Sequence, residues 1–205
     1  MFTLIYLHGF ESSPASFKAQ QLGAWLRTQQ RPLNYVVPAL SLDPERAFAQ
    51  AQAEVERALS CGDQVGIIGS SLGGYYTLAL LARYAVRGAI INPAVYPYRL
   101  LQGLLGPRCH PRTGERYVLE ARHMQSLLAL DTPYLTHPER LLMLLQTGDA
   151  TLDYREALAR YPSPAWIQPG GSHEFDDFVR VIPAALVFLG APASPGTGDA
   201  AVRVD

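Results

Sequence analysis

The chain has 205 residues, of which 48% are hydrophobic and 17% are charged, and its formal net charge at pH 7 is −1. This length and composition suit one domain with a substantial apolar core. The near-zero charge and the lack of a long basic run argue against nucleic acid as a partner. No apolar stretch reaches the roughly 18 residues of a membrane-spanning helix, so we expect no membrane span.

Residues 1–7 contain no basic leader and have the pattern of a strand, so we expect no signal peptide. The two cysteines, Cys61 and Cys109, cannot build a disulfide framework, and neither lies in a catalytic pattern. We therefore expect a cytoplasmic protein whose thiols stay reduced.

Strand-like and helix-like segments alternate along most of the chain. Short apolar runs typical of buried strands lie at 3–7, 35–38, 65–68, 86–91, 141–146 and 165–168. Segments with helical spacing of apolar residues lie at 15–29, 44–61, 75–83, 154–161 and 174–189. Asp43 followed by Pro44 is a typical helix start, whereas Pro183 interrupts the last helix.

This alternation predicts an α/β fold: a compact parallel sheet of about six strands with helices on both faces. Numbered along the chain, the strands should lie in the order 2-1-3-4-5-6, with right-handed crossovers. We expect residues 1–190 to form this single domain. Residues 191–205 are rich in Ala, Pro, Gly and Ser, and we expect them to be a disordered tail.

Residues 93–140 separate the fourth and fifth strands by far more chain than one crossover helix requires. This insertion could fold over the sheet as a lid, or it could be a purely structural excursion. A cluster of arginines lies in it: Arg99, Arg108, Arg112, Arg116 and Arg122. They could bind an anionic acyl carrier such as coenzyme A, or they could pair with neighbouring carboxylates such as Glu115 and Glu120.

The segment Gly69-Ser70-Ser71-Leu72-Gly73 joins the third strand to the next helix and fits the nucleophile elbow pattern Gly-x-Ser-x-Gly. The turn in such an elbow is so tight that side chains two residues before and after the serine would collide. Ser71 is therefore the candidate nucleophile. Ser70 is excluded, because Ile68 and Leu72 would then stand where glycines are required. The alternative is a glycine-rich turn with two ordinary serines.

A serine hydroxyl needs a base, and the base needs a carboxylate to orient it. After a nucleophile elbow these residues follow in the order Asp or Glu, then His. Asp149 directly follows the fifth strand and is the favoured acid. Asp153 is the alternative acid. If Asp153 is not the acid, we expect it to be a carboxylate that the helix dipole stabilises at a helix N-terminus. His173, in the loop after the sixth strand, is the candidate base.

An oxyanion hole requires two backbone N–H groups. Leu72, directly after the candidate nucleophile, would supply one. Phe10 would supply the other, because the loop His8-Gly9-Phe10 follows the first strand. We expect His8 to shape this loop rather than to act as a base.

We expect no cofactor and no metal. His110, His123 and His137 lack the spacing of metal ligands. Residues 69–74 lack both the Gly-Lys-Ser/Thr ending of a phosphate-binding loop and the Gly-x-Gly-x-x-Gly spacing of a dinucleotide site.

Six blocks of this sequence resemble, in order, the small bacterial YqiA-type esterases of the α/β-hydrolase superfamily. The blocks are 6–10, 69–76, 92–95, 146–149, 152–155 and 170–173. The resemblance implies a compact α/β-hydrolase fold with esterase activity, extending to acyl-CoA thioesters. By position it assigns the nucleophile to Ser71, the acid to Asp149 and the base to His173. Glu11, Glu174 and the residues beyond 190 depart from the pattern of that family.

We therefore expect a serine hydrolase that cleaves small acyl esters, or acyl-CoA thioesters, through a Ser-His-Asp triad and an acyl-enzyme intermediate. The alternative is a hydrolase-fold protein that binds an acyl ligand or a partner without turning it over.

Overall fold

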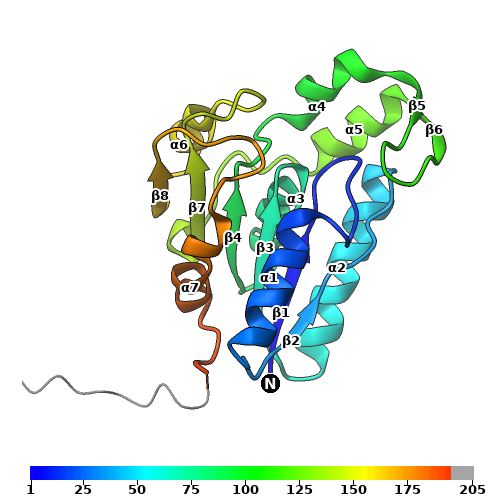
Figure 1. The fold of residues 1–205 in the computed structure, drawn as a ribbon. Helices are drawn as coiled ribbons and strands as arrows, with labels where there is room; N and C mark the ends of the chain where they lie inside the picture. The colour runs from blue at the N-terminus through cyan, green and yellow to red at the C-terminus, as the bar shows by residue number, and fades with distance from the viewer. Residues whose placement is uncertain (195–205) are drawn as a thin grey trace, which may run out of the picture.

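A parallel sheet of six strands forms the centre of the protein in the computed structural model, which describes residues 1–194 (Figure 1). The strands are β1 (Phe2–Leu7), β2 (Asn34–Val36), β3 (Gln64–Ser70), β4 (Arg87–Ile91), β7 (Leu141–Gln146) and β8 (Ala165–Gln168). Their spatial order, β2-β1-β3-β4-β7-β8, confirms the predicted topology. The central strands are mainly apolar because helices cover both of their faces. Most of the predicted tail, residues 195–205, lies outside the described residues.

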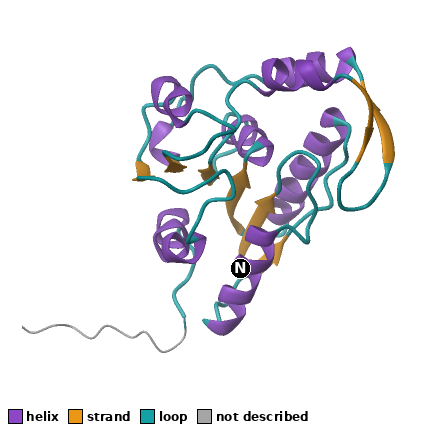
Figure 2. Cartoon of the chain, turned by 45° about the horizontal axis from the view of Figure 1, so that its top comes forward, coloured by secondary structure: helices purple, strands orange, loops and turns teal. Residues whose placement is uncertain are grey.

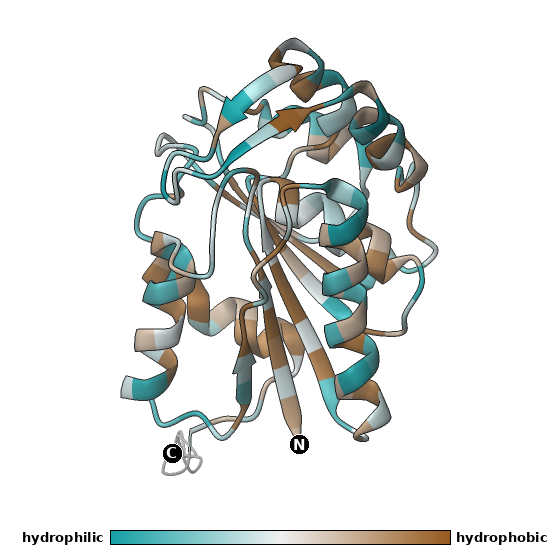
Figure 3. Cartoon of the chain, turned by 90° about the vertical axis from the view of Figure 1, so that its right-hand side faces the viewer, coloured by the Kyte–Doolittle hydropathy of each residue, from teal (hydrophilic) through white to brown (hydrophobic). Residues whose placement is uncertain are grey.

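Two helical layers enclose the sheet. Helices α1 (Phe17–Thr28) and α7 (Phe178–Leu189) cover one face, where they pack on Leu4 and Tyr6 of β1. Helices α2 (Pro44–Ser60) and α3 (Leu72–Leu81) cover the other, where they pack on Ile5 and Leu7. Helix α6 (Tyr154–Arg160) extends this second layer over β7. Figure 3 shows the mainly hydrophobic strands between helices that carry hydrophilic residues on their outer sides.

The predicted start of the second helix is confirmed, but that of the last helix is wrong. The Asp43 side chain accepts hydrogen bonds from the backbone N–H groups of Glu45 and Arg46 and so caps α2. Helix α7 begins at Phe178 rather than at residue 174. The reason is that Phe175 and Asp177 have positive φ angles of 60° and 57°, which no α-helix accepts. Residues 174–177 are thus part of the loop that carries His173.

The insertion has regular structure that the sequence did not predict. It contains α4 (Pro97–Leu100), η1 (Leu101–Leu104), β5 (Gly106–Cys109), β6 (Arg116–Leu119), α5 (Ala121–Ala129) and η2 (Pro138–Arg140). Strands β5 and β6 form an antiparallel hairpin, set apart from the central sheet in Figure 2. The insertion lies beyond the carboxyl ends of the central strands (Figure 1), and α5 contacts α2 and α4. No helix within residues 1–194 is both long and apolar enough to span a membrane.

Candidate active site

Ser71 is the single residue between β3 and α3, and its backbone is strained. Its φ of 54° and ψ of −118° lie outside the regions that L-residues normally adopt. Such a conformation typically costs about 1–3 kcal/mol and persists only where the surrounding structure imposes it. Here the Ser71 N–H donates to the Ile91 carbonyl oxygen at 3.0 Å, which ties the turn to the end of β4.

The two elbow glycines have no room for a side chain. A Cβ atom on Gly69 would overlap the Gly73 carbonyl oxygen and the Thr77 hydroxyl, and one on Gly73 would overlap the Leu7 carbonyl oxygen. The clash at Gly69 lies within the elbow, as the sequence predicts, whereas the clash at Gly73 is with β1. Both involve backbone oxygens, which cannot move aside. A Cβ atom on Gly9 would lie 3.2 Å from the Cβ of Ser71, so the loop after β1 also approaches the serine closely.

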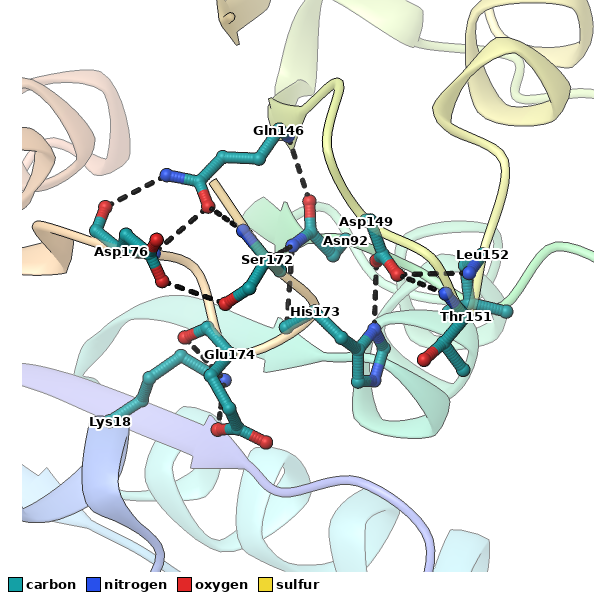
Figure 4. A network of polar contacts seen from close by, with 10 residues as sticks. All are labelled: Lys18, Asn92, Gln146, Asp149, Thr151, Leu152, Ser172, His173, Glu174 and Asp176. Carbon is teal, nitrogen blue, oxygen red and sulfur yellow. Dashed lines mark hydrogen bonds and ion pairs between the residues drawn. The ribbon is translucent and has the colours of Figure 1, made fainter. Parts of the chain in front are cut away.

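Asp149 and His173 form a direct pair. His173 Nδ1 lies 2.8 Å from Asp149 Oδ2, and the Asp149 side chain is only 1% exposed against 27% for His173. The other oxygen, Asp149 Oδ1, accepts from the N–H groups of Thr151 and Leu152 at 2.8 and 2.9 Å (Figure 4). These bonds fix the carboxylate so that Oδ2 points at the ring. Asp153 instead caps α6 by accepting from the Arg155 N–H.

Two buried amide side chains support the loop that carries His173 (Figure 4). Asn92 Nδ2 donates to the Ser172 carbonyl oxygen at 2.9 Å, while Asn92 Oδ1 accepts from the Gln146 N–H. Gln146 Oε1 accepts from the N–H groups of Ser172 and Asp176, and its Nε2 donates to the Asp176 carbonyl oxygen. The amides therefore connect the ends of β4 and β7 to both sides of His173.

Neither amide was identified as a functional residue from the residue pattern, although a signal was present. Asn92 is a polar residue at the end of an apolar strand, and Gln146 ends the run Leu141-Leu142-Met143-Leu144-Leu145. Each is at most 3% exposed. A buried polar side chain at the carboxyl end of a parallel strand must find hydrogen-bond partners there, and in this fold the partners are the functional loops.

Ser71 and His173 line one cavity of about 140 Å³, together with Gly9 and Phe10 of the loop after β1. Within residues 1–194 the Ser71 hydroxyl and the His173 ring make no hydrogen bond to each other. Catalytic hydrogen bonds are often long before substrate binds and tighten only in the complex.

The two backbone groups expected to form an oxyanion hole are free to donate. In the described part of the chain, the N–H groups of Phe10 and Leu72 have no hydrogen-bond partner. Leu72 is the first residue of α3, where a backbone N–H has no partner within the helix. His8 holds the loop: its Nε2 accepts from the Leu40 N–H, so its Nδ1 donates to the Gly9 carbonyl oxygen. Burial lowers the pKa of His8 and favours this neutral form.

The hairpin of the insertion is attached to the same loop. Arg108 donates two hydrogen bonds to the carboxylate of Glu11, at 2.8 and 3.0 Å, and the Tyr117 hydroxyl donates a third at 2.7 Å. The bonds from the Arg108 guanidinium lower the pKa of the Glu11 carboxyl. His110 Nε2 lies 3.1 Å from the Ser12 carbonyl oxygen. Glu11 therefore faces the hairpin, and its charge is compensated there.

Three of the arginines singled out in the insertion make contacts within the protein. Arg108 pairs with Glu11, and Arg122 pairs with both Glu120 and Asp43. Arg99 lies over the rings of Tyr96 and Tyr98. These contacts favour pairing within the protein over a shared anion site. Among residues 1–194, no group of three His, Cys, Asp or Glu side chains could hold a metal ion.

A family model matches residues 3–190, and it is that of the uncharacterised protein family UPF0227. The chain belongs to this family. It is the family of the YqiA-type proteins, so the resemblance noted in the sequence is confirmed.

Similar solved structures include proteins named as esterases and as α/β-hydrolases. The esterase Est1E from Butyrivibrio proteoclasticus, in a structure with ferulic acid bound, is 13% identical with a TM-score of 0.71, covering 92% of this chain and 88% of that one. The esterase domain of a Rhodothermus marinus protein is 16% identical with a TM-score of 0.63, over 92% and 85%. The mouse alpha/beta hydrolase domain-containing protein 10 is 16% identical with a TM-score of 0.61, over 90% and 87%. These likenesses confirm the predicted α/β-hydrolase fold.

Proposed function

We propose that this protein is a serine hydrolase that cleaves carboxylic esters, with Ser71 as nucleophile, His173 as base and Asp149 as the carboxylate that orients the base. The observation that carries the proposal is the pair of Asp149 and His173, 2.8 Å apart, at a cavity that the strained Ser71 also lines. A histidine with a purely structural role would not require a buried carboxylate at one ring nitrogen. It would also not require a cavity that it shares with a strained serine.

In the first half of the reaction, Ser71 Oγ attacks the ester carbonyl carbon while His173 Nε2 takes the hydroxyl proton. Asp149 stabilises the imidazolium through Nδ1. The negative charge that develops on the carbonyl oxygen is bound by the free N–H groups of Phe10 and Leu72. The bond to the leaving alkoxide then breaks, His173 gives it the proton, and the acyl group stays on Ser71.

In the second half, a water molecule attacks the acyl-enzyme and His173 takes one of its protons. The bond between Ser71 Oγ and the acyl carbon breaks, and His173 returns the proton to Ser71. The names of the similar structures, Est1E and an esterase domain, support ester hydrolysis as the reaction class. Acyl-CoA thioesters are the second substrate class that we propose. The cytoplasmic location expected from the cysteine content stays a prediction.

Hydrolysis of p-nitrophenyl acetate by the wild type and by Ser71→Ala tests the proposal, together with labelling by a fluorophosphonate. The wild type should hydrolyse and be labelled, whereas Ser71→Ala should do neither, with a loss of up to about 10⁶ in kcat. Ser126→Ala, on the exposed surface of α5, is the matched control and should behave as the wild type. Comparing matched esters and thioesters of rising chain length would then define the substrate class.

The alternative is a protein that binds an acyl ligand or partner without turnover. It would be favoured if the folded wild type binds acyl compounds but neither hydrolyses any ester of that series nor reacts with the fluorophosphonate. The free N–H groups of Phe10 and Leu72 beside the serine argue against it, since a binding protein has no oxyanion to stabilise.

A further inference from the structure

The cavity beside Ser71 is polar where an ester-binding pocket is usually apolar. Apart from Ser71 and His173, the side chains that line it include Tyr6, Ser16 and Lys18. All three come from β1 and the start of α1, on the face of the sheet that α1 and α7 cover.

Among residues 1–194, two buried hydroxyl groups at this cavity have no partner that meets hydrogen-bond geometry. Tyr6 is fully buried at 0% exposure, and its hydroxyl is unpartnered among the described residues. Burial raises the pKa of Tyr6, and the nearby hydroxyls of Ser70 and Ser16 lower it only in part, so the group is a neutral hydroxyl that can donate a hydrogen bond. Ser16 is the N-cap residue of α1, yet its side chain makes no capping bond and its hydroxyl is likewise buried without a partner in residues 1–194. Buried polar groups are rarely left unpaired, which points to a ligand for both.

Lys18, the only lysine of the chain, adds a buried positive charge. It is 6% exposed, and its Nζ donates to the backbone carbonyl oxygen of Glu174 at 2.9 Å and to Glu174 Oε2 at 3.0 Å. An ammonium group carries three protons, so one donor remains. The Glu174 side chain is 73% exposed, so solvent screens its charge more than that of Lys18. Glu174 also lines the cavity, but its charge is the more exposed of the pair, so the buried side of the cavity offers mainly hydrogen-bond donors to an acceptor oxygen.

We propose that this cavity binds a carboxylate at the end of a short acyl group, held by Lys18, Tyr6 and Ser16. This inference rests on the proposed hydrolase function and names its substrate class. The volume of about 140 Å³ is close to that of an engineered cavity of about 150 Å³ that holds benzene, so five or six non-hydrogen atoms fit. The acyl group is the part of the substrate that stays on Ser71 while water enters, and a small pocket beside Ser71 suits that part better than the leaving alcohol.

Two ethyl esters of the same shape provide the test. Monoethyl succinate and ethyl 4-methylpentanoate both carry two methylene groups after the ester carbonyl, followed by a branched end. That end is a carboxylate in the first and an isopropyl group in the second. Both release ethanol, so ethanol formation measures kcat/KM for each on one scale. We expect the wild type to favour monoethyl succinate by about tenfold or more, the usual effect of a charge-assisted hydrogen bond.

Single substitutions then assign the preference to the three residues. Tyr6→Phe and Ser16→Ala remove hydroxyl groups that make no hydrogen bond within residues 1–194, so the protein should still fold. Each should lower the ratio of the two kcat/KM values several-fold, and Lys18→Met should bring it close to one. Tyr84→Phe, which removes an exposed tyrosine hydroxyl on the other side of the sheet, should leave the ratio as in the wild type.

Three outcomes would overturn the inference. A wild-type ratio near one, with Ser71 still labelled by fluorophosphonate, would reject the carboxylate and leave the hydrolase function standing. Equal losses for both esters in the Lys18 and Tyr6 variants would mean that these residues only anchor the loop of His173. A wild type that neither hydrolyses nor is labelled would reject the proposed function and this inference with it.

Discussion

At the scale of single residues, Asp149 divides its two oxygens between two tasks. Oδ1 accepts from the Thr151 and Leu152 N–H groups, and Oδ2 faces the ring of His173. Because both oxygens only accept, the nitrogen that faces Asp149 must carry a proton. The other ring nitrogen is then the one with a free lone pair, which is the form that can take a proton from Ser71.

Asp149→Asn should therefore lower kcat by about 10⁴ while the protein stays folded. The amide can keep the two backbone bonds through its oxygen, but its NH₂ group would then face His173 and stabilise the wrong tautomer. Steady-state hydrolysis of p-nitrophenyl acetate measures the effect.

Asp153→Asn is the matched variant, because Asn caps a helix about as well as Asp. We expect its activity and melting temperature to stay near those of the wild type. A larger loss of kcat in Asp153→Asn than in Asp149→Asn would reverse the assignment of the acid.

At the scale of elements, a few buried side chains hydrogen-bond between loops that follow different strands. Asn92 connects the end of β4 to the loop of His173 through the Ser172 carbonyl oxygen. Its φ of 38° is a conformation that Asn and Asp accept more readily than most residues. The position of His173 thus depends on a residue far from it in the sequence.

Asn92→Asp tests this dependence. The carboxylate can still accept from the Gln146 N–H, but its second oxygen would face the Ser172 carbonyl oxygen and repel it. We expect kcat/KM to fall by about tenfold and the free energy of unfolding by roughly 1–3 kcal/mol. Amide hydrogen exchange should show faster exchange in the loop of His173. Unchanged exchange there, with lost activity, would argue against a positioning role.

The ion pair between Glu11 and Arg108 joins the hairpin to the loop of the proposed oxyanion hole, and it predicts a pH dependence. The pKa of Glu11 is lowered in the folded state. Its ionised form therefore stabilises the fold above the unfolded-state pKa of about 4.3, and this contribution is lost as the pH falls through the lower folded-state pKa.

We expect Glu11→Gln to be less stable than the wild type by about 1–3 kcal/mol at pH 7, because bonds from Arg108 and Tyr117 lose their charged acceptor. The difference should shrink as the pH falls below about 4. Urea unfolding at a series of pH values measures it, and Glu45→Gln at the surface of α2 is the control. A difference that is independent of pH would mean that the charge of Glu11 is not involved.

At the scale of the whole molecule, the segment after α7 contributes to the packed fold. The Ala191 N–H donates to the Leu186 carbonyl oxygen, and Arg31 Nη1 donates to the Pro192 carbonyl oxygen at 2.7 Å. Part of the segment expected to be a disordered tail therefore contacts both α7 and the loop after α1.

Truncation after residue 190 should lower the melting temperature more than truncation after residue 194. Loss of the partner of Arg31 costs about 1 kcal/mol or more, which is about 2–4 °C for a chain of this size. Thermal unfolding followed by circular dichroism compares the two. Equal melting temperatures would show that the contact of Pro192 contributes nothing.

The features that the sequence predicted well are local or periodic. The six apolar runs gave the strands, the alternation with helices gave the parallel sheet, and Asp43-Pro44 gave the start of α2. The Gly-x-Ser-x-Gly pattern predicted a strained serine, and the clash that selects Gly69 does arise within the elbow, whereas the one that selects Gly73 is with Leu7 of β1. These properties depend on neighbours along the chain, so the chain order is enough to infer them.

Other features were decided only by tertiary structure. Gln146 binds Asp176 in the loop that delays the start of α7, and Asn92 and Gln146 support the loop of His173. Arg108 pairs with Glu11. All of these contacts join residues distant in the sequence. The polar cavity likewise needs Tyr6 and Lys18 beside a histidine loop that arrives at the end of the chain. Hydrogen bonds between such segments carry no periodic signal, because their partners are set by which loops meet at the carboxyl ends of the strands.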